Sequence, residues 1–497
     1  MPSSSTGTPH QMLRPAAETT LEDHDSPLNG KPCTLTFRVT GAASVARLEP
    51  LLLDHDHRRG NGRLVTWTRA RKSGGDAGGN NNDLGARLDF VWETTVSKLR
   101  HKQHRNARVL NRLGGAQVLE DKANLVLLQR LMTAPTLESY AVSGRKAVTQ
   151  WAQLRFQQQH QTPGHSSPPP PPPQQPAPEG VLLHKERGRR REQTPTQDST
   201  AVAAVPGTAA AAAAINDGGA GGEDWWCVKA AGGNGGLDIW VLHEGNWKSV
   251  TEALSDHESY VIQRYVARPM LWRGRKFHFR VYALLRADMS AWLYRTAYIL
   301  SASRPYSLGK EKDDGRAGAV AEGDGVQREG FADELVHISN LAVNKHTEGH
   351  PGQVPCDLPS DYPALWPGFL ENLRSLAEAA TPFMEHQADP NHFEFLGLDI
   401  IADREGGVWL MEANRLPGLQ SSKQNLEQEN EVYDGMMLDV IRLLVLPPLT
   451  GCSPEPGLFE ATAAPASSAV APSTETWRNV MRFAAFKRSC RTATSLA

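Results

Sequence analysis

Three oxygen-bearing side chains near the end of the chain could together hold a metal ion: Asp399, Glu412 and Asn414. The segment 393–414, FEFLGLDIIADREGGVWLMEAN, predicts two strands joined by a polar turn over 402–407. Glu412 and Asn414 face the same side of a strand because they are two residues apart, and a hairpin can bring Asp399 beside them. Two carboxylates and an amide oxygen suit Mg²⁺, which also keeps waters and nucleotide phosphates. The alternative is a surface hairpin with solvated acids.

A glycine-rich turn upstream could approach phosphates. An apolar strand over 225–229 ends in Lys229, the turn 230–236 follows, and a second strand is predicted over 237–242. Backbone N–H groups of such a flap can approach phosphate closely, and a lysine at its base can hold phosphate as a point charge. The pattern matches neither a P-loop nor a Rossmann fingerprint. A plain hairpin explains this turn equally well.

A third feature is a strand with alternating basic residues. Within the predicted strand 274–285, Lys276, His278 and Arg280 alternate with apolar residues, so they share one face. This face could bind anions, and the alternative is a solvated outer face. Another strand is predicted over 260–266, just before it.

The composition sets limits on the class of protein. The chain has 497 residues, enough for two or three domains, and its net charge of −2 gives no global indication of nucleic-acid binding. The five cysteines are scattered without a C-x-x-C pair, which suits a reducing compartment and argues against a disulfide framework or zinc site. No apolar run is long enough for a membrane span, and the first thirty residues lack a signal-peptide pattern. We expect a soluble, cytoplasmic monomer that binds neither membrane nor nucleic acid.

Composition also divides the chain into segments, and the predicted fold class is α/β. Strands are expected over 35–39, 64–68, 88–92 and 135–142, and helices over 119–129 and 432–446, the last stopped by Pro447 and Pro448. The expected divisions are a disordered tail 1–32, an N-terminal α/β lobe 33–118, a central lobe 119–156 with 223–300, a low-complexity insert 157–222, a C-terminal lobe 301–449 with the metal site, and a linker with a short basic helix 450–497. The basic cluster 185–191 in the insert is either a solvated linker or a site for an acidic partner.

Six segments, in order, resemble the tubulin–tyrosine ligase family, whose members have an ATP-grasp fold. The segments are LDFVWE at 88, LEDKANLVLLQRL at 119, WWCVKAAGGNGGLDIWVL at 225, YVIQRYVARPMLWRGRKFHFRVYALL at 260, HISNLAVNKH at 337 and the hairpin at 393. They cover most of the chain outside its low-complexity parts. The hairpin and the R-K-F-x-x-R block are the specific ones. The resemblance implies three lobes, with ATP bound between the central and C-terminal lobes.

The resemblance also implies roles for individual residues. The nucleotide site is expected to comprise Lys122, Lys229, Gly232, Gly233, Asn234, Gly235, Gly236, Gln263, Arg264, Tyr265, Val266 and Lys276. Mg²⁺ is expected on Asp399, Glu412 and Asn414. Arg280 and Lys276 are expected to act in catalysis, and the acceptor and amino acid are expected to contact Arg280, Arg295, His337 and Asn340.

The chain departs from the family pattern at three positions. His278 stands where the family usually has aspartate, and Leu300 stands near where a second arginine is usual. Ala230 follows the phosphate lysine where many members have proline or serine. These departures bear on the amino-acid substrate more than on the ATP site.

The resemblance implies an ATP-dependent ligase that joins a free amino acid to a carboxylate of a protein, expected to be tubulin or another acidic tail. Asn344 to His346 favours glutamate over tyrosine or glycine. The enzyme would work in the cytoplasm, on microtubules or cilia. One alternative is a tubulin-binding protein that keeps the ATP-grasp shell but has lost transfer activity, as His278 and Leu300 would suggest. Another is an ATP-grasp ligase for a small molecule.

Overall fold

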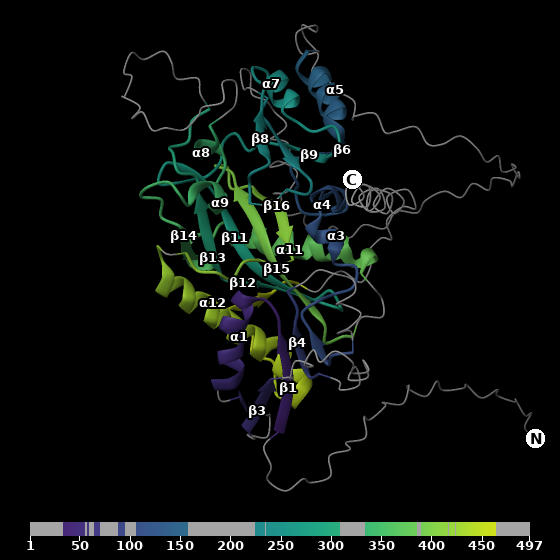
Figure 1. The fold of residues 1–497 in the computed structure, drawn as a ribbon, viewed down its shortest axis with the longest axis vertical. Coiled ribbons are helices and arrows are strands. Elements are labelled where there is room, and N and C mark those ends of the chain that lie inside the picture. Colours follow the sequence, from purple (N-terminus) through teal and green to yellow (C-terminus); the bar gives the residue numbers. More distant parts are fainter. Residues whose placement is uncertain are drawn as a thin grey trace, which may run out of the picture.

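The computed structural model describes residues 33–54, 57–58, 64–69, 88–94, 106–157, 224–233, 235–308, 333–384, 389–415, 417–422 and 424–463. The predicted disordered tail and insert and the basic helix over 476–491 lie outside these residues. Helices alternate with strands in three sheets, as expected for the α/β class. The N-terminal sheet lies at one end of the molecule and a four-stranded sheet at the other, with an eight-stranded sheet between them (Figure 1). No described helix is both long and apolar enough to cross a membrane.

The N-terminal sheet has the order β2-β3-β1-β4-β5 and contains the three strands predicted there. Its strands are β1 (Cys33–Val39), β2 (His57–Arg58), β3 (Leu64–Arg69), β4 (Phe90–Trp92) and β5 (Val109–Leu110). β3, β1, β4 and β5 are parallel, and α1 (Ala42–Asp54), which the sequence analysis did not predict, follows β1. Parallel neighbours need a crossover between them, and α1 makes part of the first one.

The eight-stranded sheet carries the hairpin. Its path is β14-β13-β11-β12-β17, and β15 joins it by pairing with β11. The strands are β10 (Leu271–Trp272), β11 (Arg275–Arg286), β12 (Ala291–Tyr294), β13 (Thr296–Ser301), β14 (Gln353–Asp357), β15 (Phe393–Ala402), β16 (Val408–Asn414) and β17 (Phe459–Ala461). Because β11 to β13 share this sheet with β15, the chain passes from the four-stranded to the eight-stranded sheet between β9 and β10, and the expected lobe boundary at residue 300 falls within β13.

Two apolar cores lie on the two faces of this sheet. One face packs against α3 (Gln117–Glu120), α4 (Lys122–Gln129) and α11 (Trp366–Ala380) through Leu119, Leu125 and Phe369. The other face packs against α1 and α12 (Leu426–Val440), with Tyr282 and Tyr433 fully buried. The sheet is therefore covered on both faces, and its long strands are apolar on both sides.

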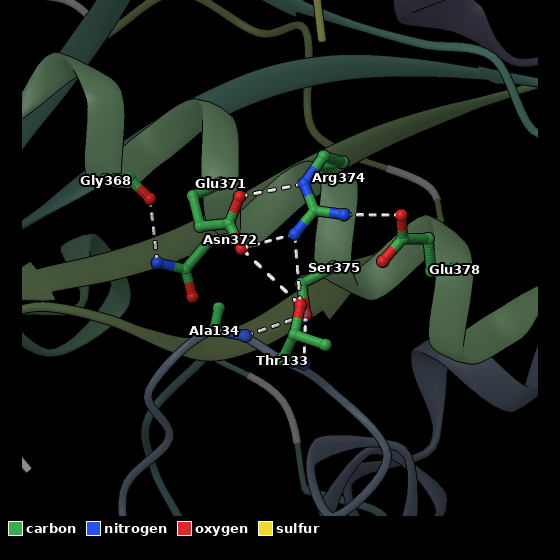
Figure 2. A network of polar contacts seen from close by, with 8 residues as sticks. All are labelled: Thr133, Ala134, Gly368, Glu371, Asn372, Arg374, Ser375 and Glu378. Carbon is green, nitrogen blue, oxygen red and sulfur yellow. Dashed lines mark hydrogen bonds and ion pairs between the residues drawn. The ribbon is translucent and has the colours of Figure 1, made fainter. Parts of the chain in front are cut away.

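A polar network on α11 holds the loop between α4 and β6 (Ser139–Ser143), a strand of the four-stranded sheet (Figure 2). Ser375 Oγ accepts hydrogen bonds from the N–H groups of Thr133 and Ala134, at 2.6 and 2.9 Å. Arg374 pairs with Glu371 and Glu378 on its own helix and also donates to Thr133 Oγ1. The network fixes the loop that leads to Leu137 in the cavity described below.

The four-stranded sheet has the order β6-β9-β7-β8. Its strands are β6 (Ser139–Ser143), β7 (Trp226–Ala230), β8 (Ile239–Leu242) and β9 (Ser259–Arg264). α5 (Gly144–Gln157) and α7 (Trp247–Glu252) cover one face around a core that includes Trp226 and Ile262. All four strands were predicted, with boundaries that differ by a few residues.

The C-terminal part differs from the prediction in two ways. α12 continues through a π-helical turn (η4, Ile441–Val445) into α13 (Leu446–Thr450), so Pro447 and Pro448 do not stop the helix. The prolines stand in the first turn of α13, where no intrahelical N–H bond is lost, and Gly451 ends it at a φ of 73°. Residues 451–463 are also not only a linker, because β17 within them pairs with β12.

The remaining elements are short. They are α8 (Glu334–His337), α9 (Leu341–Asn344), α10 (Leu358–Asp361) and the 3₁₀ turn η3 (Thr381–Phe383). α8, α9 and α10 lie near β11, β13 and β14 respectively, while η3 follows α11. α8 and α9 carry the HISN segment, which faces the site.

Candidate functional site

A cavity of about 60 Å³ lies between the four-stranded and the eight-stranded sheet. One wall comes from β7 and β9, the other from β11, β15, β16 and the segment before α9. Its polar lining includes Lys229, Gln263, Lys276, His278, His337, Ser339, Asn340, Asp399 and Glu412. Most of the residues singled out from the sequence therefore meet here, although they come from segments more than 100 residues apart.

The hairpin places its two carboxylates face to face. β15 and β16 pair antiparallel with Asp399 opposite Glu412, as predicted. The register shifts after this pair, so Met411 is an extra residue in β16. This bulge lets Met411 and Glu412 both line the cavity while Leu410 and Ala413 stay in the core. Two hard oxygen ligands thus stand side by side on a rigid hairpin.

Arg280 forms a two-pronged ion pair with Asp399. Its Nε donates to Oδ1 at 2.5 Å and its Nη2 donates to Oδ2 at 3.1 Å. Burial disfavours the charge of Asp399, but the guanidinium outweighs this effect and lowers the pKa of the carboxyl. Burial likewise opposes the charge of Arg280, and Asp399 raises its pKa above the usual value. Both groups are therefore charged at neutral pH.

Two lysines approach the same carboxylates, Lys229 from β7 in the opposite wall and Lys122 from α4, outside the cavity lining. Lys122 begins α4, whose N-terminus is capped by Asp121, and its Nζ lies 3.0 Å from Glu412 Oε1 and donates to Gly233 O at 2.5 Å. Lys229 Nζ donates to Gln263 Oε1 at 2.7 Å, and burial lowers the pKa of this lysine. The cations and anions of the site are thus paired with one another, which explains why the cavity is small.

Lys276 is held on an aromatic ring. Its Nζ lies 3.9 Å from the centroid of Tyr265 and donates to His337 O at 3.0 Å. Burial lowers the pKa of Lys276 to about 8. Tyr265 Oη hydrogen-bonds His337 Nδ1 at 2.9 Å, and burial, with Lys276 nearby, lowers the pKa of His337 to about 3. His337 is neutral at pH 7, so Lys276 remains the cation of this corner.

The two main departures from the family pattern lie opposite each other on two paired strands. His278 on β11 is in register with Leu300 on β13, and both are buried. His278 Nδ1 hydrogen-bonds Ser339 Oγ at 2.7 Å, and its Nε2 lies 3.8 Å from Asp399 Oδ1. Burial lowers the pKa of His278 to about 4, so the imidazole is neutral at pH 7. The shared face of Lys276, His278 and Arg280 on β11 was predicted correctly. The alternative, that this face is solvated, is wrong.

Some predicted residues lie away from the cavity. Gly232, Gly233, Gly235 and Gly236 form the flap beyond its wall, where a Cβ on Gly236 would lie 2.7 Å from Asn340. Asn234 lies outside the described residues. Val266 and Tyr265 line the cavity as expected, and so does Arg264.

Three of the predicted side chains make their polar contacts outside the cavity or do not line it, and Arg264 is one of them although it is part of the lining. The guanidinium of Arg264 pairs with Asp224 and stacks on Trp226. Arg295 pairs with Asp357, at 3.4 Å, and is not part of the cavity lining. Asn414 is opposite Gly397, two pairs beyond Asp399 and Glu412. It shares their face but does not line the cavity.

The sequence analysis missed most of the apolar wall. Cys227, Leu137, Ile239, Ile401 and Met411 line the cavity, together with Ser339 and Ile338 from the HISN segment. For Cys227 a signal existed, because period two along β7 places it on the same face as Lys229. Nothing in the sequence marks the other apolar residues, since they resemble any core residue.

A comparison with protein families bears on this arrangement. The family model described as "Tubulin-tyrosine ligase family" matches residues 138–355 and 363–452, which include the cavity residues of both sheets except Leu137. This match covers more than half of the chain and confirms the resemblance stated above.

Individual relatives are similar at low identity. A probable tubulin polyglutamylase TTLL9 of Bos taurus is 25% identical over 224 residues, 41% of this chain and 42% of the relative. A probable tubulin–tyrosine ligase of Schizosaccharomyces pombe is 22% identical over 39% of this chain and 44% of the relative, and human tubulin polyglutamylase TTLL6 is 24% identical over 38% and 22%. The aligned part thus spans less than half the length of these relatives. The α/β chain belongs to the tubulin-tyrosine ligase family and has its ATP-grasp-like fold.

Proposed function

We propose that this protein is an ATP-dependent ligase that adds glutamate to a carboxylate of a protein chain through an acyl-phosphate intermediate. The observation that carries the proposal is that Asp399 and Glu412 line one cavity between two sheets, and that Arg280 and Lys122, outside its lining, pair with these two carboxylates. These paired charges of both signs are largely buried, and they come from four elements that lie apart in the sequence, α4, β11, β15 and β16. This arrangement is typical of a site that handles phosphate and metal together.

The nucleotide would lie between the sheets. Lys122, Lys229 and Lys276 supply the positive charge for its phosphates, and the apolar wall around Leu137, Ile239 and Met411 suits a flat base. Lys122, Lys229 and Lys276 contact Glu412, Gln263 and His337 respectively, so each lysine would exchange this contact for one with phosphate when a nucleotide binds. The flap above Asn340 can move with Lys122, which is hydrogen-bonded to it.

A Mg²⁺ ion fits the donor set of the hairpin. Asp399 and Glu412 are opposite each other and Asn414 shares their face, so three oxygen donors lie along one edge. When bound, Mg²⁺ would neutralise charge on the transferring phosphoryl group. Both oxygens of Asp399 are now held by Arg280, so the arginine must give up part of its ion pair. It is then free to turn toward an anionic reactant.

The residues of the chain would act in two steps. A carboxylate oxygen of the acceptor protein attacks the γ-phosphorus of ATP, and ADP leaves. The amine of free glutamate then attacks the acyl carbon, the C–O bond to phosphate breaks, and the amine loses a proton. Lys276 lines the cavity, and Arg280 lies on the same face of β11, bound to Asp399, so both can hold the negative charge of the phosphoryl group.

Tubulin is proposed as the acceptor because the relatives are named as tubulin polyglutamylases or as a tubulin–tyrosine ligase. Work in the cytoplasm on microtubules or cilia, by a monomer, belongs to the same proposal. Glutamate is preferred because polyglutamylases are prominent among those relatives.

A second candidate is a tubulin-binding protein without transfer activity. The observation in its favour is the register of His278 with Leu300, because this places both departures at one point of the sheet, where His278 lines the cavity. The intact set of Asp399, Glu412 and the three lysines favours the ligase.

The test is incorporation of labelled amino acids into purified tubulin with Mg-ATP, using glutamate, glycine and tyrosine separately. Incorporation of glutamate that is lost in Glu412→Gln would support the ligase, because this variant removes one metal-binding charge at nearly constant volume. Binding of ATP without incorporation of any amino acid would favour the second candidate.

A further inference from the structure

His278 carries a ring nitrogen without a partner beside the carboxylates of the candidate metal centre. The side chain is 2% exposed and lines the cavity together with Asp399 and Glu412. Its Nε2 is buried and has no hydrogen-bond partner among the described residues. A buried polar atom that is left unpaired is unfavourable, so a bound group that occupies Nε2 would remove this cost.

The other nitrogen of the ring, Nδ1, is held by a hydroxyl group, 2.7 Å from Ser339 Oγ. Ser339 is itself held, because the fully buried Asn344 donates from Nδ2 to the carbonyls of Ile338 and Asn340, at 2.7 and 3.0 Å. A serine hydroxyl can accept a hydrogen bond as well as donate one, so it can take the proton of Nδ1. Nε2 then presents a lone pair, and the ring is oriented by a hydrogen bond on its far side. Imidazoles that bind metal ions in proteins are held in this way.

The separation between Nε2 and the nearest carboxylate suits a metal ion better than a water molecule. Nε2 lies 3.8 Å from Asp399 Oδ1. A water that bridges two atoms needs a hydrogen bond of about 2.8 Å to each, which places the bridged atoms roughly 4.5 Å apart. Two metal bonds of about 2.0–2.2 Å can join atoms up to about 4.3 Å apart. A metal ion therefore fits between these two atoms, although Nε2 is closed to water.

The remaining donors lie on adjoining strands of the same sheet. Asp399 and Glu412 are opposite each other on β15 and β16, and β11, which carries His278, pairs with β15 with Arg280 opposite Asp399. Asp399 Oδ1 now accepts from Arg280 Nε, so metal binding requires the movement of Arg280 already proposed above. The imidazole and the two carboxylates thus come from three consecutive strands of a buried sheet, which holds them in place.

We propose that His278 is a nitrogen ligand of the metal centre, and that this centre therefore prefers Mn²⁺ over Mg²⁺. The inference rests on the metal site in the proposed function. Mg²⁺ binds oxygen ligands in proteins and tolerates little departure from an ideal octahedron. Mn²⁺ accepts the same carboxylate and phosphate oxygens and, as a transition metal, also accepts imidazole. A nitrogen in place of one oxygen thus favours Mn²⁺ without excluding nucleotide phosphates.

The test uses the full chain with a non-hydrolysable ATP analogue and either Mn²⁺ or Mg²⁺. Electron–nuclear double resonance of bound Mn²⁺ detects nitrogen atoms bonded to the metal, and protein labelled with [¹⁵N]histidine is compared with unlabelled protein. Calorimetry gives a Kd for each metal, and the ratio of the two values cancels losses of affinity that a substitution causes for both. The variants are His278→Asn and His278→Asp. The matched control is His337→Gln, the other histidine of the cavity lining, whose Nδ1 is bonded to Tyr265 Oη.

We expect a nitrogen coupling that changes with the ¹⁵N label, persists in His337→Gln and is absent in both His278 variants. The ratio of the Mg²⁺ Kd to the Mn²⁺ Kd should fall about tenfold in His278→Asp and stay unchanged in His337→Gln. The coupling in the wild-type protein can be measured even if a variant fails to fold.

Bound Mn²⁺ without a histidine coupling would overturn the inference and leave a metal centre of oxygen ligands only. An unchanged ratio of Kd values in His278→Asp would also overturn it. Absence of any bound metal would refute the inference together with the metal site of the proposed function. Failure of the ligase alone would appear separately, as absent glutamate transfer by a protein whose Mn²⁺ shows the nitrogen coupling.

Discussion

Replacing His278 with aspartate tests whether the cavity is a metal centre. His278 is 2% exposed, is neutral at pH 7, and its Nε2 lies 3.8 Å from Asp399 Oδ1. Aspartate at this position brings a third carboxylate into the site, close to that of Asp399. Aspartate is shorter than histidine, so the two charges would stand about 5 Å apart and repel by roughly 3 kcal/mol at an effective dielectric constant of about 20.

Nearby cations offset part of this repulsion, because Arg280 and Lys276 share the face of β11 with residue 278. We therefore expect the Asp variant to have a free energy of unfolding about 2 kcal/mol lower than that of His278→Asn, in the absence of divalent cations. The Asn variant is the matched control, because it also loses the imidazole contact to Ser339 but adds no charge.

The assay is denaturant unfolding of the wild type and both variants, with and without Mg²⁺. Mg²⁺ should remove most of the difference, because a third carboxylate tightens binding and a ligand at 100 times its Kd stabilises by about 2.7 kcal/mol. If the Asp variant is as stable as the Asn variant and gains no more from Mg²⁺ than the wild type, the reasoning about this metal centre is wrong.

Three further predictions concern nucleotide binding and stability. Burial lowers the pKa of Lys276 to about 8, so this lysine loses its charge as the pH rises through 8. The nucleotide Kd, measured by calorimetry, should therefore rise between pH 8 and 9.5. The same rise in Lys276→Met would exclude this lysine as the cause. Gly236→Ala should weaken nucleotide binding several-fold, because Gly236 has a φ of 82° and a Cβ there would lie 2.7 Å from Asn340. Gly232→Ala should not, because a Cβ there meets nothing within 4 Å. Equal Kd values for the two variants would contradict a role for the flap. Glu394→Gln leaves two buried arginines, Arg112 and Arg415, without a full countercharge and should lower the free energy of unfolding by about 3–5 kcal/mol. The control Glu405→Gln, at the exposed pair with Arg268, should lower it by less than about 1 kcal/mol. Similar losses for the two variants in urea titrations would refute the argument.

The hairpin was predictable from the sequence because its information is local. Alternation of apolar residues, the turn chemistry at 402–407 and the spacing of Glu412 and Asn414 all lie within 22 residues. The same applies to the shared face of Lys276, His278 and Arg280. The bulge at Met411 was not predictable, because the register of β16 against β15 decides which residue of β16 is extra.

Long-range pairing explains most of what the sequence analysis missed. Nothing local indicates that β11 pairs with β15, more than 100 residues later, so both the Arg280–Asp399 ion pair and the change of sheet before β10 were hidden. Pro447 and Pro448 were interpreted as a stop signal, but the first turn of a new helix accepts them. Arg112 and Arg415 carried no motif, and only the fold brings them together on Glu394.

The central claim is that the acceptor carboxylate is activated by phosphorylation. The most direct measurement uses an acceptor peptide with ¹⁸O in its carboxylate, incubated with the protein, Mg-ATP and glutamate, with mass analysis of the released phosphate. Attack of the carboxylate oxygen on the γ-phosphorus predicts one ¹⁸O atom in phosphate for each amide bond formed, and none with Glu412→Gln. Amide formation with unlabelled phosphate would contradict the acyl-phosphate route.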